Sequence, residues 1–286
     1  MRRSTKTTKI LLLTPPILLT YTTHRFLSTL EAKYPPTDPT TTTSLGLRTP
    51  RNPATQHCPA IDVFEARAVP VQSLLKRYRT LLQAHPQSPP ITTETTELEN
   101  KEKKRETLLK AWILTFLNTP PLLHEASIFN LFKNRTYDPG DTGLITFSPS
   151  TTPSQKMLKE IPILNDILTI ESFTPSNPLP SLLLSWTLPP EPIHFFETLS
   201  RWGYPFRLMS GGRHELSISP IYTHNGEEVV DVRFASAHDY EVIEHEGGVD
   251  SQKMIPRWVG RLHRGYARFL LHAAVGDVGE PVKILL

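Results

Sequence analysis

Hydrophobic and polar residues alternate most clearly in the last third of the chain. Residues 213–222 and 230–234 alternate between apolar and polar side chains, as a half-buried strand does. Between them, Asn225-Gly226 supplies the two residue types that most readily adopt the positive φ angles of a type I′ turn. The pattern therefore predicts an antiparallel hairpin.

Apolar residues at helical spacing predict several helices. The longest covers residues 251–275, where Trp258, Leu262, Tyr266 and Phe269 share one face. Shorter apolar runs bounded by proline or glycine predict strands. The other predicted helices cover residues 71–82, 101–117, 122–132 and 192–202, and the short strands cover residues 61–69, 144–147 and 182–188.

These elements predict one α+β domain over residues 61–286, in which a curved antiparallel sheet packs on the long C-terminal helix. The 286 residues include 28 prolines, about twice the usual share, so part of the chain is expected to be extended or disordered. Residues 34–60 are rich in Pro and Thr and predict a disordered linker. Residues 148–181 predict a Pro-rich insertion, within which residues 156–168 have the spacing of a helix.

Residues 1–33 have the composition of a targeting or anchor segment. Four cations lie within the first nine residues, and no acid occurs before Glu31. This composition favours a mitochondrial presequence, with a membrane anchor formed by residues 10–23 as the alternative and a secretory signal as a third possibility. A complete membrane span is not favoured, because the apolar run is shorter than the ~20 residues needed and contains Pro15-Pro16.

The distribution of charge argues against nucleic-acid binding. Seven cations and two acids give residues 1–50 a net charge of +5, so the +3 of the whole chain leaves −2 for the rest. A body that is slightly acidic lacks the basic field that attracts a phosphate backbone. The single cysteine, Cys58, excludes a disulfide within the chain and a cysteine-rich zinc site.

Four arginines form a second stripe along the predicted C-terminal helix. Arg257, Arg261, Arg264 and Arg268 are separated by four, three and four residues, so they lie on one side of the helix. Two interpretations remain open. The stripe is either a solvated face, or a surface for lipid head groups, a ligand phosphate or an acidic partner.

Imidazoles and acids are dense between residues 214 and 245, and His214, His238 and Asp239 are the candidates for proton transfer. A metal site is not expected, because these histidines form no H-x-x-x-H or H-x-H pair. No cofactor is expected either, because the sequence contains neither a phosphate-binding P-loop nor a dinucleotide-binding G-x-G-x-x-G motif.

Three segments together resemble an uncharacterised helix-grip-like domain family, related to START and polyketide-cyclase proteins. They are residues 61–64 before a helix, residues 112–120, and residues 234–237 followed by 262–271. The resemblance covers about residues 61–278. The long leader and the Pro-rich stretch 148–181 depart from it, which leaves the number of strands and the size of the cavity open.

The resemblance implies a cavity between sheet and helix that binds a hydrophobic small molecule or lipid. The residues expected to line it are Trp186, Phe234, Trp258, Leu262, Tyr266 and Phe269. The first alternative is a cyclase or isomerase that acts on a polyketide or terpenoid, with His214, His238 and Asp239 transferring protons. The second is a scaffold protein that uses the arginine stripe. Whether the chain is an enzyme stays open.

Overall fold

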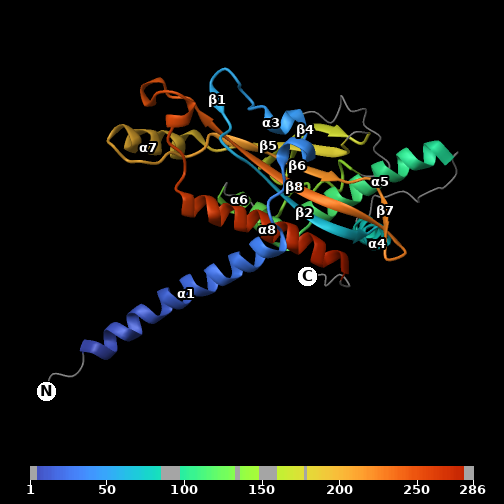
Figure 1. Cartoon of the computed structure of the whole chain (residues 1–286), viewed down its shortest axis with the longest axis horizontal. Coiled ribbons are helices and arrows are strands. Elements are labelled where there is room, and N and C mark those ends of the chain that lie inside the picture. Colours follow the sequence, from blue (N-terminus) through green and yellow to red (C-terminus); the bar gives the residue numbers. More distant parts are fainter. Residues whose placement is uncertain (1–4, 85–96, 133–135, 148–159, 177–178, 280–286) are drawn as a thin grey trace.

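The strand β8 (Glu227–Glu241) forms the centre of a curved antiparallel sheet (Figure 1). The computed structural model describes residues 5–84, 97–132, 136–147, 160–176 and 179–279. Within these residues, eight strands make one sheet, in which β2 (Ile61–Pro70) and β6 (Gly211–Ile218) both pair with β8. The remaining strands are β1 (Gln56–His57), β3 (Pro162–Ile163), β4 (Leu168–Thr174), β5 (Ser181–Thr187) and β7 (Tyr222–His224).

Four helices cover one face of this sheet. They are α4 (Val71–Gln83), α5 (Glu97–Leu117), α6 (Pro120–Phe132) and α8 (Arg257–Gly279). The alternating residues of the strands form the core with them: Phe64, Leu216 and Phe234 are buried against Trp112 and Leu270. The prediction of an α+β fold with an antiparallel sheet and a C-terminal helix packed on it is confirmed.

The opposite face of the sheet is covered by the segment that contains α2 (Pro39–Thr42) and α3 (Leu45–Arg48). Leu47 of α3 is fully buried against Val63 and Leu183. This differs from the disordered linker that the composition of residues 34–60 predicts. The segment is fixed because two charged side chains of β6 reach out to it: Arg213 donates to backbone carbonyls of α3, and Glu215 accepts from the Ser44 N–H.

The predicted hairpin is confirmed at its turn. Asn225 and Gly226 have φ angles of 51° and 83° and join β7 to β8. By contrast, the strand predicted at residues 144–147 is wrong, because these residues form a turn. The Asp141 carboxylate accepts hydrogen bonds from the Gly143 N–H and the Thr146 hydroxyl, which wraps the chain around it.

The helix predicted over residues 156–168 is also not observed where the structure describes the chain. Residues 148–159 lie outside the described part, and β3 and a turn occupy residues 160–167. The C-terminal helix begins at Arg257 rather than at 251, because Pro256 precedes it and a 3₁₀ turn occupies Val249–Ser251. A similar turn occupies Glu244–Glu246.

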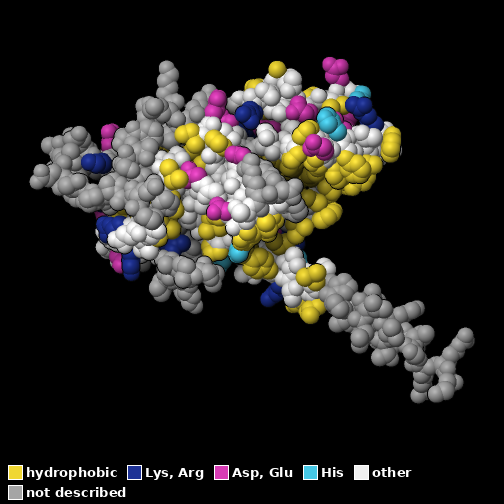
Figure 2. All heavy atoms as spheres, turned by 180° about the vertical axis from the view of Figure 1, so that it is seen from behind, with side chains coloured by type: hydrophobic (Ala, Val, Ile, Leu, Met, Phe, Trp, Pro, Cys, Tyr) yellow, Lys and Arg dark blue, Asp and Glu magenta, His cyan; other side chains and the backbone are white. Residues whose placement is uncertain are grey.

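Two helices extend beyond the sheet. The N-terminal helix α1 (Thr5–Lys33) lies beside α8 at its last residues and projects away from the body (Figure 1). At the other end, α7 (Pro190–Arg201) and the residues after it expose Phe195, Trp202 and Tyr204. Hydrophobic side chains gather at this end of the molecule (Figure 2). No helix within the described residues combines the length and the apolar character that crossing a lipid bilayer requires.

Candidate functional site

The alternation of β6 and β8 places three polar side chains on the helix-covered face of the sheet. His214 and Ser236 are directly opposite each other in register, and His238 is opposite Gly212. Trp186 of β5 lies across Gly212, where an added Cβ would come within 2.9 Å of the indole ring. A glycine at this position therefore allows Trp186 to contact both imidazoles, with ring centroids 6.1 Å from His214 and 6.0 Å from His238.

Helix α8 adds a third imidazole to this group. His263 Nε2 lies 2.8 Å from His238 Nε2, and the two rings meet edge to face with centroids 4.5 Å apart. A contact of this length between two ring nitrogens is a hydrogen bond in which one ring donates and the other accepts. The pair consequently connects the first turns of α8 to the C-terminal part of β8.

All three imidazoles are held in the neutral form. Burial lowers the pKa of His214 to about 3, and burial together with the nearby His263 lowers the pKa of His238 to about 3. Burial also lowers the pKa of His263, with Arg264 acting in the same direction. A neutral imidazole offers one donor and one acceptor, so the group can accept or donate hydrogen bonds near neutral pH but carries no charge.

A pocket of about 210 Å³ opens beside the His238–His263 pair. It lies between the first turns of α8 and strands β2 and β8, so it is on the sheet side of the helix. One part of its wall is apolar and the other part is polar or charged. The lining residues are Pro59, Ala60, Asp62, His238, Tyr240, Met254, Ile255, Pro256, Arg257, Gly260, His263 and Arg264.

Positive charge dominates the polar wall of this pocket. Arg257 is exposed at its rim, and the Arg264 guanidinium lies over Gly260, because a Cβ added there would be 3.3 Å from its Nη1. Asp62 is the acid of the wall. Burial raises the pKa of Asp62, while Arg264 and Arg268 act against that rise. In the part of the chain that the structure describes, Arg264 has no ion pair shorter than 4.0 Å, and the acid on which its charge acts within the pocket is Asp62.

Behind the imidazole pair, two buried polar atoms have no hydrogen-bond partner among the described residues. They are the Ser236 Oγ and the Trp186 Nε1. Buried polar atoms are normally paired, since leaving one unpaired costs about 1–3 kcal/mol. Their position next to His214 and His238 extends the polar character of the pocket wall into the protein.

The residues predicted to transfer protons are only partly brought together. His214 and His238 share a face, but Asp239 points to the opposite face of the sheet, because adjacent strand residues alternate. There Asp239 binds Arg213, with Nη2 to Oδ1 at 2.5 Å. In the described residues, no three His, Cys, Asp or Glu side chains are placed to hold a metal ion.

The predicted cavity-lining residues do not surround one space. Phe234 is buried in the core, and Tyr266 and Phe269 pack at the edge of that core. Trp258 is 67% exposed and Leu262 is 43% exposed, on the side of α8 away from the pocket. Helical periodicity separated the two sides of α8, but the pocket side of its first turns carries Arg257, His263 and Arg264.

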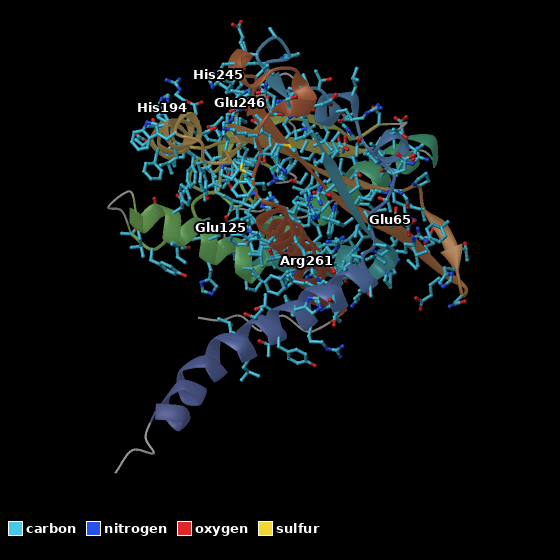
Figure 3. All side chains as sticks on the ribbon, turned by 60° about the vertical axis from the view of Figure 1, so that its left-hand side comes forward. Glu65, Glu125, His194, His245, Glu246 and Arg261 are labelled. Carbon is cyan, nitrogen blue, oxygen red and sulfur yellow. The ribbon has the colours of Figure 1, made fainter. Side chains whose placement is uncertain are left out.

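The arginine stripe is used largely within the protein. Arg261, labelled in Figure 3 where α8 meets α1, pairs with Glu31 of α1. Arg268 is buried, donates to the Tyr34 carbonyl and lies 4.1 Å from the centre of the Phe64 ring. Only Arg257 and Arg264 line the pocket. The stripe is therefore neither a wholly solvated face nor a continuous partner surface.

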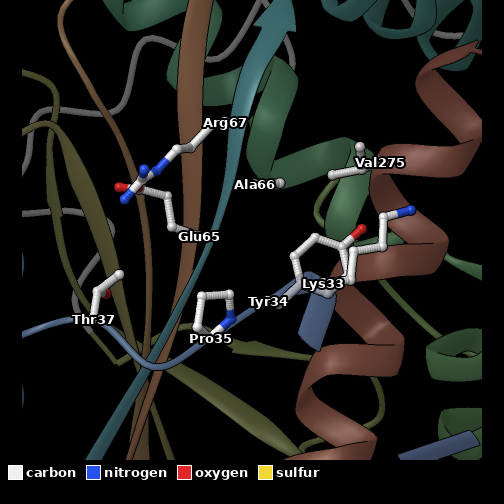
Figure 4. A pocket seen from close by; sticks show the side chains of 8 residues that line it. All are labelled: Lys33, Tyr34, Pro35, Thr37, Glu65, Ala66, Arg67 and Val275. Carbon is white, nitrogen blue, oxygen red and sulfur yellow. The ribbon is translucent and has the colours of Figure 1, made fainter. Parts of the chain in front are cut away.

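A larger pocket of about 450 Å³ lies where α1, β2 and the end of α8 meet (Figure 4). Its acid, Glu65, is already paired with Arg67 at 2.8 Å and with Arg233 at 2.6 Å. Lys33 Nζ and the Tyr34 hydroxyl both contact the His272 Nδ1. Because these polar groups are engaged with one another, this pocket offers fewer free contacts to a ligand than the pocket beside His263.

No protein-family model matches the sequence, and the searches of curated proteins and of solved structures give no match. The geometry therefore carries the functional argument. His263, Asp62 and Met254 are pocket residues that the sequence analysis did not select. A signal existed for His263, which lies beside Arg264 on the predicted helix, but His263 is distant in sequence from the imidazoles between residues 214 and 245.

Proposed function

We propose that the protein binds a small amphipathic carboxylate, of the fatty-acid type, in the pocket beside His238 and His263. The observation that carries this proposal is the pocket wall itself. It combines a neutral imidazole pair and an arginine without an ion pair with an apolar surface of Met254, Ile255 and Pro256. A largely apolar pocket with a few convergent polar groups and perturbed pKa values is the usual form of a ligand site.

Electrostatics favour an anionic head group. The pocket carries Arg257 and Arg264 against a single acid, Asp62, whose pKa is raised by burial. A guanidinium fits the planar geometry of a carboxylate and forms charge-assisted hydrogen bonds to it. The imidazole pair supplies a further neutral donor on the same wall.

The size of the pocket limits the ligand. Its volume of about 210 Å³ is below the range of about 300–1,000 Å³ that is common for drug-sized ligands. A short acyl chain suits this space. If the ligand has a longer acyl chain, the pocket encloses its carboxylate end and the rest of the acyl chain lies outside the pocket. The helix-grip-like resemblance also supports a ligand between the sheet and the C-terminal helix.

The imidazoles support binding better than proton transfer. A general base works best when its pKa is near the working pH, whereas burial lowers the pKa of His214 and His238 to about 3. At that value, an imidazole is a weak base at neutral pH. The cyclase or isomerase alternative also needs Asp239, which lies on the other face of the sheet and is paired with Arg213.

Calorimetric titration with octanoate tests the proposal. Arg264→Gln removes the charge but keeps a polar side chain, so affinity for octanoate is expected to fall at least about tenfold. The matched control is Arg67→Gln, which removes an exposed arginine at the larger pocket. If octanoate does not bind to the native chain, or if Arg67→Gln lowers the affinity and Arg264→Gln does not, the proposal is wrong.

A further inference from the structure

The described part of α1 divides into two regions with opposite surroundings. Leu27 and Leu30 are buried against the body. Leu18, Leu19 and Tyr21, which precede them, are 58%, 68% and 59% exposed. Figure 2 shows hydrophobic side chains at the surface where this helix leaves the body. The C-terminal end of α1 therefore belongs to the core, whereas the part that precedes it exposes large apolar side chains.

The buried end of α1 is joined to α8 by a specific set of contacts. Arg261 binds Glu31 through two parallel hydrogen bonds, Nε to Oε1 at 2.8 Å and Nη2 to Oε2 at 2.9 Å. The Ser28 hydroxyl accepts from the same guanidinium at 3.2 Å. Two-point pairing of this kind fixes direction as well as distance.

Close packing adds to these polar contacts. Gly265 allows α1 to approach so closely that an added Cβ would lie 2.1 Å from Leu27 Cδ2. Phe26 and Phe269 meet edge to face, with ring centroids 5.8 Å apart. The helix is thereby held at one angle to the body, and its preceding 19 residues (5–23) extend roughly 30 Å at 1.5 Å per residue.

The charge of this region indicates which partner it meets. Arg2, Arg3, Lys6, Lys9 and Arg25 are balanced by no acid before Glu31. Two copies of a segment that carries five cations and no acid before Glu31 repel one another. An anionic lipid surface attracts them instead, by about 1 kcal/mol for each Lys or Arg near the surface, and accepts the apolar side chains as well.

We propose that α1 is an arm that attaches the protein to a membrane surface rich in anionic lipid. The exposed residues Leu18, Leu19 and Tyr21 enter the interface, and the positive net charge of the first 30 residues strengthens the attraction to anionic lipid. Tyrosine is a residue type that favours this region of a membrane. The junction of Arg261 with Glu31 then sets the orientation of the body above the surface.

Vesicle co-sedimentation of the full chain tests this arm. Binding is expected to be stronger to vesicles that contain phosphatidylserine with phosphatidylcholine than to phosphatidylcholine alone, and to weaken as salt is raised. Arg2→Gln with Arg3→Gln is expected to lower the partition coefficient by about tenfold or more. Leu18→Asp with Leu19→Asp is expected to lower it at least as far.

Leu45→Asp is the matched control, because Leu45 is 71% exposed on α3, far from α1 on the opposite face of the sheet. Partition of this variant is expected to equal that of the native chain. The proposal is overturned if the two vesicle types bind equally, or if the Leu18/Leu19 variant binds as the native chain does. It is also overturned if analytical ultracentrifugation finds a dimer that the Leu18/Leu19 variant abolishes, since a second copy then covers α1.

Discussion

Arg213 is bound to Asp239 inside the layer between the sheet and α3. Arg213 Nη2 donates to Asp239 Oδ1 at 2.5 Å and Nε donates to Oδ2 at 3.2 Å. The remaining nitrogen donates to the carbonyls of Gly46, Leu47 and Thr49. One guanidinium thus satisfies a buried acid and the carbonyls at the end of a short helix, which attaches residues 38–57 to the sheet.

Replacing Arg213 by Ala is expected to lower the free energy of unfolding by about 3–5 kcal/mol, because Asp239 is left buried without its partner. The measurement is urea denaturation followed by circular dichroism. Lys104→Ala is the control, because Lys104 forms an exposed pair with Glu228, and its loss is expected to cost no more than about 1 kcal/mol. Equal effects of the two substitutions would contradict the proposed anchoring role.

The buried histidines predict that the protein becomes less stable as the pH falls below about 6.5. Burial lowers the pKa of His214 and His238 to about 3 in the folded chain, whereas an unfolded histidine titrates near 6.5. Between these values the unfolded chain binds more protons, so acid favours unfolding. The stability that the neutral rings provide is complete above about pH 6.5 and is lost towards pH 3.

The free energy of unfolding measured at several pH values checks this expectation. His214→Phe removes one titrating ring from the core and is expected to reduce the slope between about pH 4 and 6 by about 1.4 kcal/mol per pH unit. His194→Phe replaces an exposed histidine on α7 and serves as the control for the effect of the substitution itself. The same slope in all three proteins would show that His214 is not buried in its neutral form.

The contact of Gly265 with Leu27 predicts a non-additive pair of substitutions. Gly265→Ala is expected to destabilise the protein by about 1–3 kcal/mol, although alanine favours helices, because its methyl group collides with Leu27. In a Leu27→Ala background, the same substitution is expected to cost less or to stabilise. A double-mutant cycle with thermal denaturation measures the coupling, and additive effects would contradict the packing of α1 on α8.

The sequence predicted those parts of the fold that depend on local periodicity. The hairpin at Asn225-Gly226 and the terminal helix belong to this class, because both patterns span neighbouring residues. The packing of residues 34–57 depends on single long-range contacts, such as Arg213 to the carbonyls of α3, which composition does not reveal. The Pro- and Thr-rich composition consequently predicted a linker where the structure has a packed layer.

The site was predicted only in part for a related reason. The density of imidazoles and acids between residues 214 and 245 identified His238 as a candidate, and the register of β8 places it on the inner face. Its partner His263 comes from a helix, and periodicity in α8 separates two sides without indicating which one meets the sheet. The apolar side with Trp258 was predicted to face the ligand. In the structure, Arg261 pairs with Glu31 of α1 and Arg268 packs on Phe64 of β2. These two arginines therefore face the rest of the protein.

Contacts between octanoate and Met254 test the central claim most directly. With methionine methyl groups labelled with ¹³C, nuclear Overhauser effects report which of the four methionines lies beside the bound acyl chain. We expect effects between octanoate protons and the Met254 methyl group, and none to the buried Met209, which does not line the pocket. If octanoate at a saturating concentration gives no effect at Met254, the pocket beside His238 and His263 is not its binding site.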